Sequence, residues 1–269
     1  MKKLTLLLIP VLAMGMVSCG GGKKAGGDNP FFAEWNTPYG MPPFDKIKPE
    51  HFKPAYEEAM KLHNQEIEAI VNNTEEPNFE NTIYALDNAG EMLSKVRSAF
   101  GMLSSADTND DIKAVNKEMS PILTAHSDNI SLNHKLFERV KSVYENREAL
   151  GLDQLQARLT EKRYKSFVNS GAELSDAGKE KMRQLNTEMS KAQLDFSNNL
   201  LDANNAFLMV VEEADLEGLP EGTIAAAKEL AENKGHADKY AFSLDKPSLL
   251  PFLTYSDRRD LREQLYRGY

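Results

Sequence analysis

A helical spacing of apolar residues between Glu50 and about Asn204 is the strongest constraint on the fold. Large apolar side chains recur there at steps of three and four, the period that places them on one face of an α-helix. Runs of Val, Ile and Thr are almost absent, whereas Ala, Leu, Glu, Lys and Met are abundant, and such a composition favours helix over strand. The sequence therefore predicts a mainly α protein.

The spacing divides this region, and the part that follows it, into separate amphipathic helices. The expected helices span residues 50–70, 78–100, 110–129, 136–143, 155–167, 175–204, 224–233 and 256–266. Asn78 is a favourable N-cap for the second helix, and Ser256 is expected to cap the last. Pro121 is expected to kink the third helix and Gly171 to end the fifth.

The helix expected from Ser175 to about Asn204 is the longest. Its apolar positions alternate steps of three and four, as in one helix of a coiled coil, and they are Met182, Leu185, Met189, Ala192, Phe196 and Ala203. Each large side chain buried on such a stripe contributes on the order of 1.5–3 kcal/mol. We therefore expect the stripe to be buried against other helices in a bundle.

Two segments depart from the helical pattern. Short apolar runs near residues 206–211 and 240–244 are bounded by polar and proline-bearing turns, so they predict at most a small two-stranded β element. Residues 29–49 combine several prolines with aromatic residues, which predicts an extended arm anchored on the body by its aromatic side chains.

The first residues predict a signal peptide over residues 1–18. Lys2 and Lys3 precede an apolar stretch, Leu4–Val17, which is too short to cross the roughly 30 Å hydrocarbon core of a bilayer as a stable helix. Residues 19–29 are rich in glycine and predict a flexible tether, which leaves residues 30–269 as the helical body.

The end of the apolar stretch, Met16-Val17-Ser18-Cys19, resembles the lipobox of bacterial lipoprotein precursors. The resemblance implies cleavage between Ser18 and Cys19 and lipidation of Cys19, where two or more acyl chains anchor a protein firmly. It thus implies an exported, membrane-anchored bacterial lipoprotein that faces the periplasm. An ordinary cleaved signal with an incidental cysteine is the alternative.

Cysteine content and charge exclude other classes. Cys19 is the only cysteine, so an internal disulfide is impossible. The formal charge of −9 becomes −11 when residues 1–18, with the two lysines Lys2 and Lys3, are removed. Without a clustered basic surface, nucleic acid is not an expected partner.

Several segments together resemble the zinc peptidases of the thimet oligopeptidase, oligopeptidase A and peptidyl-dipeptidase Dcp kind. These segments are Phe79-Glu80-Asn81-Thr82-Ile83 with Leu86, Asp195-Phe196-Ser197-Asn198-Asn199, Leu216-Glu217-Gly218-Leu219-Pro220 and Tyr240–Tyr269. The resemblance covers essentially everything from Asn29 onward. It implies the multi-helix N-terminal lobe of a neurolysin-like metallopeptidase, with the catalytic domain absent.

The chemistry of that family depends on zinc. The resemblance implies a zinc ion held by H-E-x-x-H and a later glutamate, acting on short peptides and, in Dcp-type members, releasing C-terminal dipeptides. None of the five histidines starts such a motif; they are His51, His63, His126, His134 and His236. No zinc ligand or catalytic residue is therefore assigned in this chain, and the 269 residues alone are expected to be inactive.

Other candidate sites have simpler interpretations. His63 on an apolar stripe is expected to be a hydrogen-bonded packing residue, and His126 and Asp128, two positions apart, do not share a helix face. The charge cluster at 257–263 is interpreted as surface ion pairs, with the wall of a peptide channel as the alternative. Adjacent glutamates such as Glu57 and Glu58 indicate a solvated face.

Three functions remain open on the sequence. The first is the N-terminal part of a lipid-anchored zinc peptidase with short peptides as substrates. The second is a non-catalytic helical lipoprotein that binds peptides or a protein partner. The third is the product of a frameshifted or fragmentary gene, whose exposed apolar surface would favour aggregation.

Overall fold

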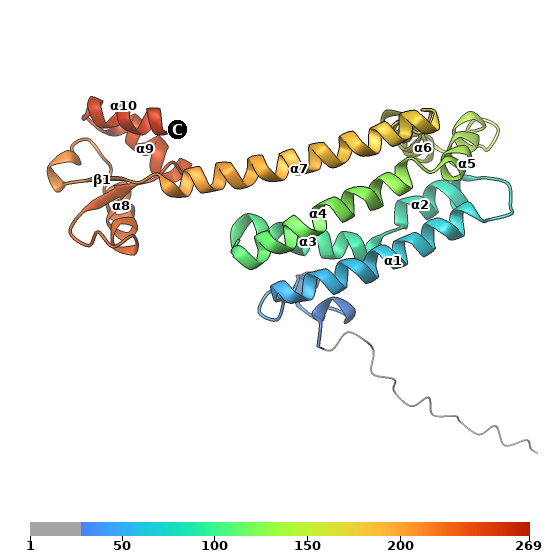
Figure 1. The fold of residues 1–269 in the computed structure, drawn as a ribbon, viewed down its shortest axis with the longest axis horizontal. Helices are drawn as coiled ribbons and strands as arrows, with labels where there is room; N and C mark the ends of the chain where they lie inside the picture. The colour runs from blue at the N-terminus through green and yellow to red at the C-terminus, as the bar shows by residue number, and fades with distance from the viewer. Residues whose placement is uncertain (1–27) are drawn as a thin grey trace, which may run out of the picture. The chain divides into compact units, whose positions relative to one another are not determined.

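The computed structural model describes residues 28–269, and helices dominate this part of the chain (Figure 1). The chain divides into two compact units. The first comprises residues up to Met119 together with Arg139–Thr160, and the second comprises Ser120–Glu138 together with Glu161–Tyr269. The prediction of a mainly α protein is confirmed. The predicted signal peptide and the residues Ser18 and Cys19 lie outside the described residues.

The first unit begins with the predicted arm and contains the early helices. Three short 3₁₀ turns form the arm: η1 (Pro30–Phe32), η2 (Pro38–Gly40) and η3 (Pro49–His51). They are followed by α1 (Phe52–Val71), the π-helical turn η4 (Phe79–Tyr84), α2 (Ala85–Asn88) and α3 (Glu91–Ala106). The helices α4 (Asp110–Ser131), α5 (His134–Glu145) and α6 (Gln154–Asn169) each have residues in both units.

An aromatic cluster anchors the arm on the first unit. The ring of Phe31 lies 5.2 Å from that of Phe52, which lies 5.0 Å from the ring of Phe100 in an edge-to-face arrangement. Trp35 donates a hydrogen bond from Nε1 to the carbonyl oxygen of Pro30 at 2.9 Å, and the ammonium group of Lys95 lies 4.0 Å from the Trp35 ring centre. Such aromatic pairs stabilise a core beyond the area that they bury. The predicted anchoring is confirmed, but the arm forms short turns where a wholly extended chain was expected.

The helix predicted over residues 78–100 is wrong in one respect, because it breaks at Gly90. Asn78 is the N-cap, as predicted: its side chain accepts a hydrogen bond from the backbone of Asn81 at 2.9 Å. Gly90 has a φ of 81°, a left-handed conformation that a residue with a Cβ adopts at a cost. The helix therefore ends after α2 and starts again as α3.

Two side chains of α1 hold this break in place. Glu66 accepts a hydrogen bond from the Gly90 backbone N–H at 2.7 Å, and a Cβ on Gly90 would lie 2.9 Å from Cε1 of His63. The His63 ring thus packs against the glycine backbone, as its predicted packing role requires, and burial lowers its pKa. A glycine is required here both for the backbone angle and for the space.

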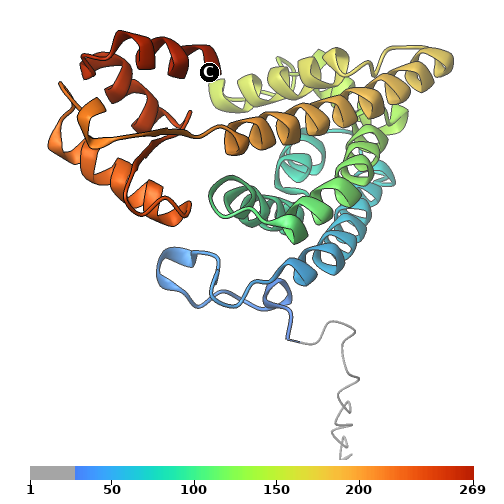
Figure 2. The same cartoon turned by 60° about the vertical axis from the view of Figure 1, so that its left-hand side comes forward.

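The second unit contains the long helix and everything after it. The order is α7 (Asp176–Ala206), β1 (Met209–Val211), the 3₁₀ turn η5 (Glu213–Asp215), α8 (Glu221–Asn233), β2 (Tyr240–Phe242), α9 (Lys246–Tyr255) and α10 (Arg259–Gly268). The strands pair antiparallel with Val210 opposite Ala241, which confirms the small β element. Both views show α7 as one uninterrupted helix (Figures 1 and 2).

The core of the second unit lies between the two strands and the last three helices. The rings of Phe242 and Phe252 are 4.5 Å apart, and Leu265 of α10 is fully buried in the same cluster. The helix α9 was not expected from the sequence. Ser256 does not cap α10 as predicted, because the N-cap is Arg258; the Ser256 side chain accepts a hydrogen bond from the Arg258 backbone N–H at 3.2 Å.

The prediction that the apolar stripe of α7 is buried is wrong. None of the residues of α7 is buried, and Leu185, Met189, Phe196 and Leu200 are 47%, 55%, 68% and 50% exposed. We call these four residues the α7 stripe. The side of α7 that contacts α4 carries polar residues, among them Asn186 and Ser190. The spacing of apolar residues therefore identified the helix, but it did not identify which side of the helix contacts α4.

A substitution at Gly90 tests the explanation of the helix break. We expect Gly90→Ala to lower the free energy of unfolding by about 1–3 kcal/mol, because alanine must adopt a left-handed conformation and its Cβ meets the His63 ring. Gly101→Ala is the matched control: it lies within α3 with open space around its Cα, so alanine should stabilise by up to about 1 kcal/mol. Urea denaturation followed by circular dichroism measures both. Equal effects of the two substitutions would contradict the explanation.

Candidate functional site

The five histidines are spread over the fold and do not form a metal site. His51 belongs to η3, where its Nδ1 accepts a hydrogen bond from the Lys48 backbone N–H at 3.1 Å. The other histidines lie in α1, α4 and α5 and in the loop after α8. Within residues 28–269 no group of three or more His, Cys, Asp or Glu side chains is arranged to hold a metal ion.

Several polar residues of α4 contact polar residues of α7 within the second unit. Asp128, predicted not to pair with His126, accepts a hydrogen bond from the side chain of Asn186 at 2.7 Å. Both Asp128 and His126 are buried. Ser120 and Thr124 each lie within hydrogen-bonding distance of the Ser190 hydroxyl, at 3.1 and 3.0 Å. We call this set of contacts the polar seam. It consists of Ser120, Thr124 and Asp128 of α4 together with Asn186 and Ser190 of α7.

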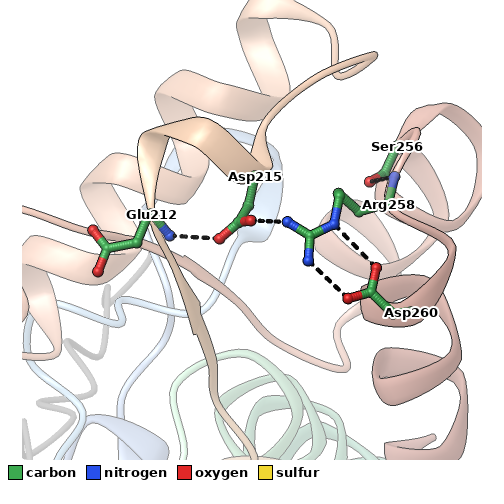
Figure 3. A network of polar contacts seen from close by, with 5 residues as sticks. All are labelled: Glu212, Asp215, Ser256, Arg258 and Asp260. Carbon is green, nitrogen blue, oxygen red and sulfur yellow. Dashed lines mark hydrogen bonds and ion pairs between the residues drawn. The ribbon is translucent and has the colours of Figure 1, made fainter.

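The charge cluster predicted at 257–263 forms ion pairs within the second unit (Figure 3). Arg258 donates from Nε and Nη2 to the two carboxylate oxygens of Asp260, at 3.0 and 2.7 Å, and from Nη1 to Asp215 of η5. The other oxygen of Asp215 accepts from the Glu212 backbone N–H at 3.1 Å. The hydrogen bonds to Arg258 lower the pKa of Asp260, and those to Asp260 raise the pKa of Arg258. The interpretation as ion pairs is confirmed.

Two segments that carry the family resemblance meet beside this cluster. The Asp257 backbone N–H donates to the Glu217 carbonyl oxygen at 3.0 Å. Gly218 has a φ of 86°, and a Cβ there would lie 2.3 Å from the carbonyl oxygen of Tyr255. The segment 216–220 thus requires glycine at its centre to approach the end of α9. The cluster and this contact join η5 and its following loop to the junction between α9 and α10.

The first unit contains a groove between the arm and α1. Its volume is about 1480 Å³, and its lining includes Phe32, Trp35, Pro54, Glu57 and Lys61. Aromatic and proline surfaces beside charges of both signs suit an extended ligand with apolar and charged groups, such as a short peptide. Lys61 is paired with Glu58 at 3.0 Å, so part of the charge at the rim is already compensated.

None of the helices within residues 28–269 combines the length and the apolar character that a membrane span requires.

Burial accounts for the lowered pKa of Lys95 and for the strongly raised pKa of Tyr56, both in the first unit. These shifts follow from packing in a core and identify no catalytic group.

Comparison with known proteins matches most of the chain to part of several proteins named as peptidases. The chain is 39% identical over 239 residues to a dipeptidyl carboxypeptidase of Escherichia coli K12, a match that covers 88% of the chain and 35% of the relative. It is 32% identical over 233 residues to oligopeptidase A of Haemophilus influenzae, which covers 86% of the chain and 34% of that protein. The chain corresponds to an N-terminal part of the dipeptidyl carboxypeptidase and oligopeptidase A family.

This correspondence confirms the resemblance that the sequence motifs indicated. A dipeptidyl carboxypeptidase of Salmonella typhimurium is 36% identical over the same length, whereas no family profile matches the chain. The chain spans about a third of the length of these curated relatives.

Sequence reasoning missed Asp215 as the partner of Arg258. The two residues are 43 positions apart, and an ion pair at such a separation leaves no periodic trace in the sequence. The signal that was available is Gly218 within Leu216–Pro220, because a glycine between larger residues marks a close approach of backbones.

A pair of glycine substitutions tests the contact between this loop and α9. We expect Gly218→Ala to lower the free energy of unfolding by roughly 2–4 kcal/mol, because the new Cβ meets a backbone oxygen and the left-handed angle is strained. Gly222→Ala, in the first turn of α8 with open space around it, should change stability by less than about 1 kcal/mol. Thermal unfolding of the two variants beside the unsubstituted chain distinguishes them. A tolerated Gly218→Ala would show that the close approach does not matter.

Proposed function

We propose that this chain is the N-terminal helical region of a zinc metallopeptidase that cleaves short peptides and releases C-terminal dipeptides. The observation that supports this most is the 39% identity, over 88% of the chain, to a protein named dipeptidyl carboxypeptidase. The segments at 79–86, 195–199, 216–220 and 240–269, which resemble those of this family, also support the proposal. Zinc and the dipeptide product come from the resemblance to Dcp-type members of the family.

In this proposal the described residues supply structure and substrate contact, and the zinc chemistry belongs to a catalytic part outside them. Zinc held by H-E-x-x-H would activate a water molecule for attack on the peptide carbonyl. The helices of this chain would form a wall beside the peptide, and the groove between the arm and α1 offers a surface that a peptide could contact.

A peptide-hydrolysis assay tests whether dipeptide release requires the catalytic part in addition to this chain. The purified chain, incubated with short peptides that have free C-termini, should release no dipeptide. A chimera that joins this chain to the portion of the E. coli relative beyond the matched region should release dipeptides, and a zinc chelator should abolish that release. Mass spectrometry identifies the products. Chelator-sensitive release by the chain alone would overturn the proposal.

The groove also favours a second candidate, a non-catalytic helical lipoprotein that binds peptides. Binding of short peptides to the purified chain, together with an inactive chimera, would support this candidate against the peptidase. Isothermal titration with the peptides of the hydrolysis assay measures the binding directly.

We further propose that the protein is exported by the signal at residues 1–18 and anchored to a bacterial membrane through lipid on Cys19, on the periplasmic side. The support is the Met16-Val17-Ser18-Cys19 segment after a charged and apolar start. In a bacterial expression strain, Cys19→Ala should move the protein from the membrane to the soluble fraction and remove labelling by radioactive palmitate. Unchanged labelling of Cys19→Ala would show that Cys19 is not the anchor.

A further inference from the structure

The α7 stripe is an apolar surface that nothing in the second unit covers. Its four members, Leu185, Met189, Phe196 and Leu200, are about half exposed or more. Leu185, Met189 and Phe196 follow the heptad spacing of a coiled-coil core, and Leu200 lies next to that row. Monomeric soluble proteins rarely leave a contiguous apolar surface on one helix open, and those that do generally bind a partner through it.

The orientation of this stripe is fixed by the polar seam on another side of the helix. The buried carboxylate of Asp128 accepts a hydrogen bond from Asn186 at 2.7 Å, and Ser190 lies 3.1 Å from Ser120. Rotating α7 to bury the stripe against α4 would break these bonds and leave the buried Asp128 without its Asn186 donor. The stripe therefore stays open unless a further element covers it.

Charges beside the stripe restrict what that element can be. Glu188, Asp195 and Asp202 follow one another at intervals of seven along one flank of the stripe, and all three are exposed. In a coiled coil, residues at this heptad position lie next to the apolar core and pair with charges on the opposing helix. A complementary partner thus carries an apolar face with Lys or Arg along one edge.

The same charges argue against an antiparallel pair of these helices. In an antiparallel pair the equivalent flanks face each other, so Glu188 and Asp195 of one copy would oppose acidic residues of the other. The whole chain also has a formal charge of −9, which adds to the repulsion between copies.

We propose that the α7 stripe docks an amphipathic helix with a basic flank that belongs to the catalytic part of the same peptidase. The chain spans 35% of the length of its dipeptidyl carboxypeptidase relative, so about two thirds of such a protein is available to supply this helix. The choice of this source rests on the proposed function. The chemistry inferred for the partner helix rests only on the α7 stripe and on the acidic residues Glu188, Asp195 and Asp202.

Two synthetic helical peptides test the chemistry of the surface. They share one Leu-rich face and differ only in their flanks, which carry Lys in one peptide and Glu in the other. Fluorescence anisotropy should show the purified chain binding the Lys peptide about tenfold or more tightly than the Glu peptide at low salt. The difference should shrink as salt screens the charges. Failure to bind either peptide, or equal binding of both, would overturn the proposed surface.

Variants of the chain locate the binding. Phe196→Asp should reduce binding of the Lys peptide about tenfold or more, whereas Leu155→Asp, at an equally accessible apolar residue that is 80% exposed in the first unit, should leave it unchanged. Glu188→Lys combined with Asp195→Lys should reverse the preference between the peptides. Glu180→Lys, on α7 but away from the stripe, is the control for a charge change and should not. Loss of binding in both controls would contradict the assignment.

The chimera of the hydrolysis assay tests the source of the helix. Hydroxyl-radical footprinting should label Met189 and Phe196 in the chain alone and show at least a severalfold loss of labelling in the chimera. Protection already present in the monomeric chain, or a dimer by light scattering that Phe196→Asp abolishes, would overturn the proposal. If the chimera does not fold, the peptide comparison decides. An inactive chimera that still protects Phe196 would count against the proposed function and not against the docking surface.

Discussion

The hydrogen bond between Asn186 and the buried carboxylate of Asp128 determines which side of the longest helix remains open. Asp128 is 5% exposed, so its charge needs a polar partner in place of water. Asn186 supplies that partner, and Ser190 extends the contact to Ser120 and Thr124. Once this polar face is fixed, the apolar positions of α7 point elsewhere. The exposure of the α7 stripe is thus a consequence of a polar contact.

The sequence predicted the helices well wherever one face of a single helix is buried on the body. In α1 the buried residues Phe52, Tyr56 and Ile70 all lie on the predicted stripe. The break at Gly90 was missed because buried residues continue at helical spacing on both sides of it, and a positive φ leaves no mark on periodicity. The helix α9 was missed because Pro247 and Pro251 interrupt its pattern, although Pro247 lies in the first turn, where proline is tolerated.

The α7 stripe shows a different limit of sequence reasoning. Periodicity states which residues share a face, and this was correct for Leu185, Met189 and Phe196. It does not state what the face contacts, and burial was inferred from hydrophobicity alone. Similarly, the ion pairs of Arg258 were expected in kind, but its partner Asp215 depends on how η5 folds back toward α10. Contacts between distant segments require the fold.

The comparisons and the structure agree on a mainly helical chain that corresponds to an N-terminal part of larger peptidases. Within residues 28–269 no group of three or more His, Cys, Asp or Glu side chains is arranged to hold a metal ion, while the matches cover about a third of the length of the relatives named as peptidases. Sequencing the messenger RNA across the codon for Tyr269 is the most direct test of the account. The predicted result is an open reading frame that continues into an H-E-x-x-H motif. A stop codon directly after Tyr269, in a transcript that yields a stable and abundant protein, would contradict it.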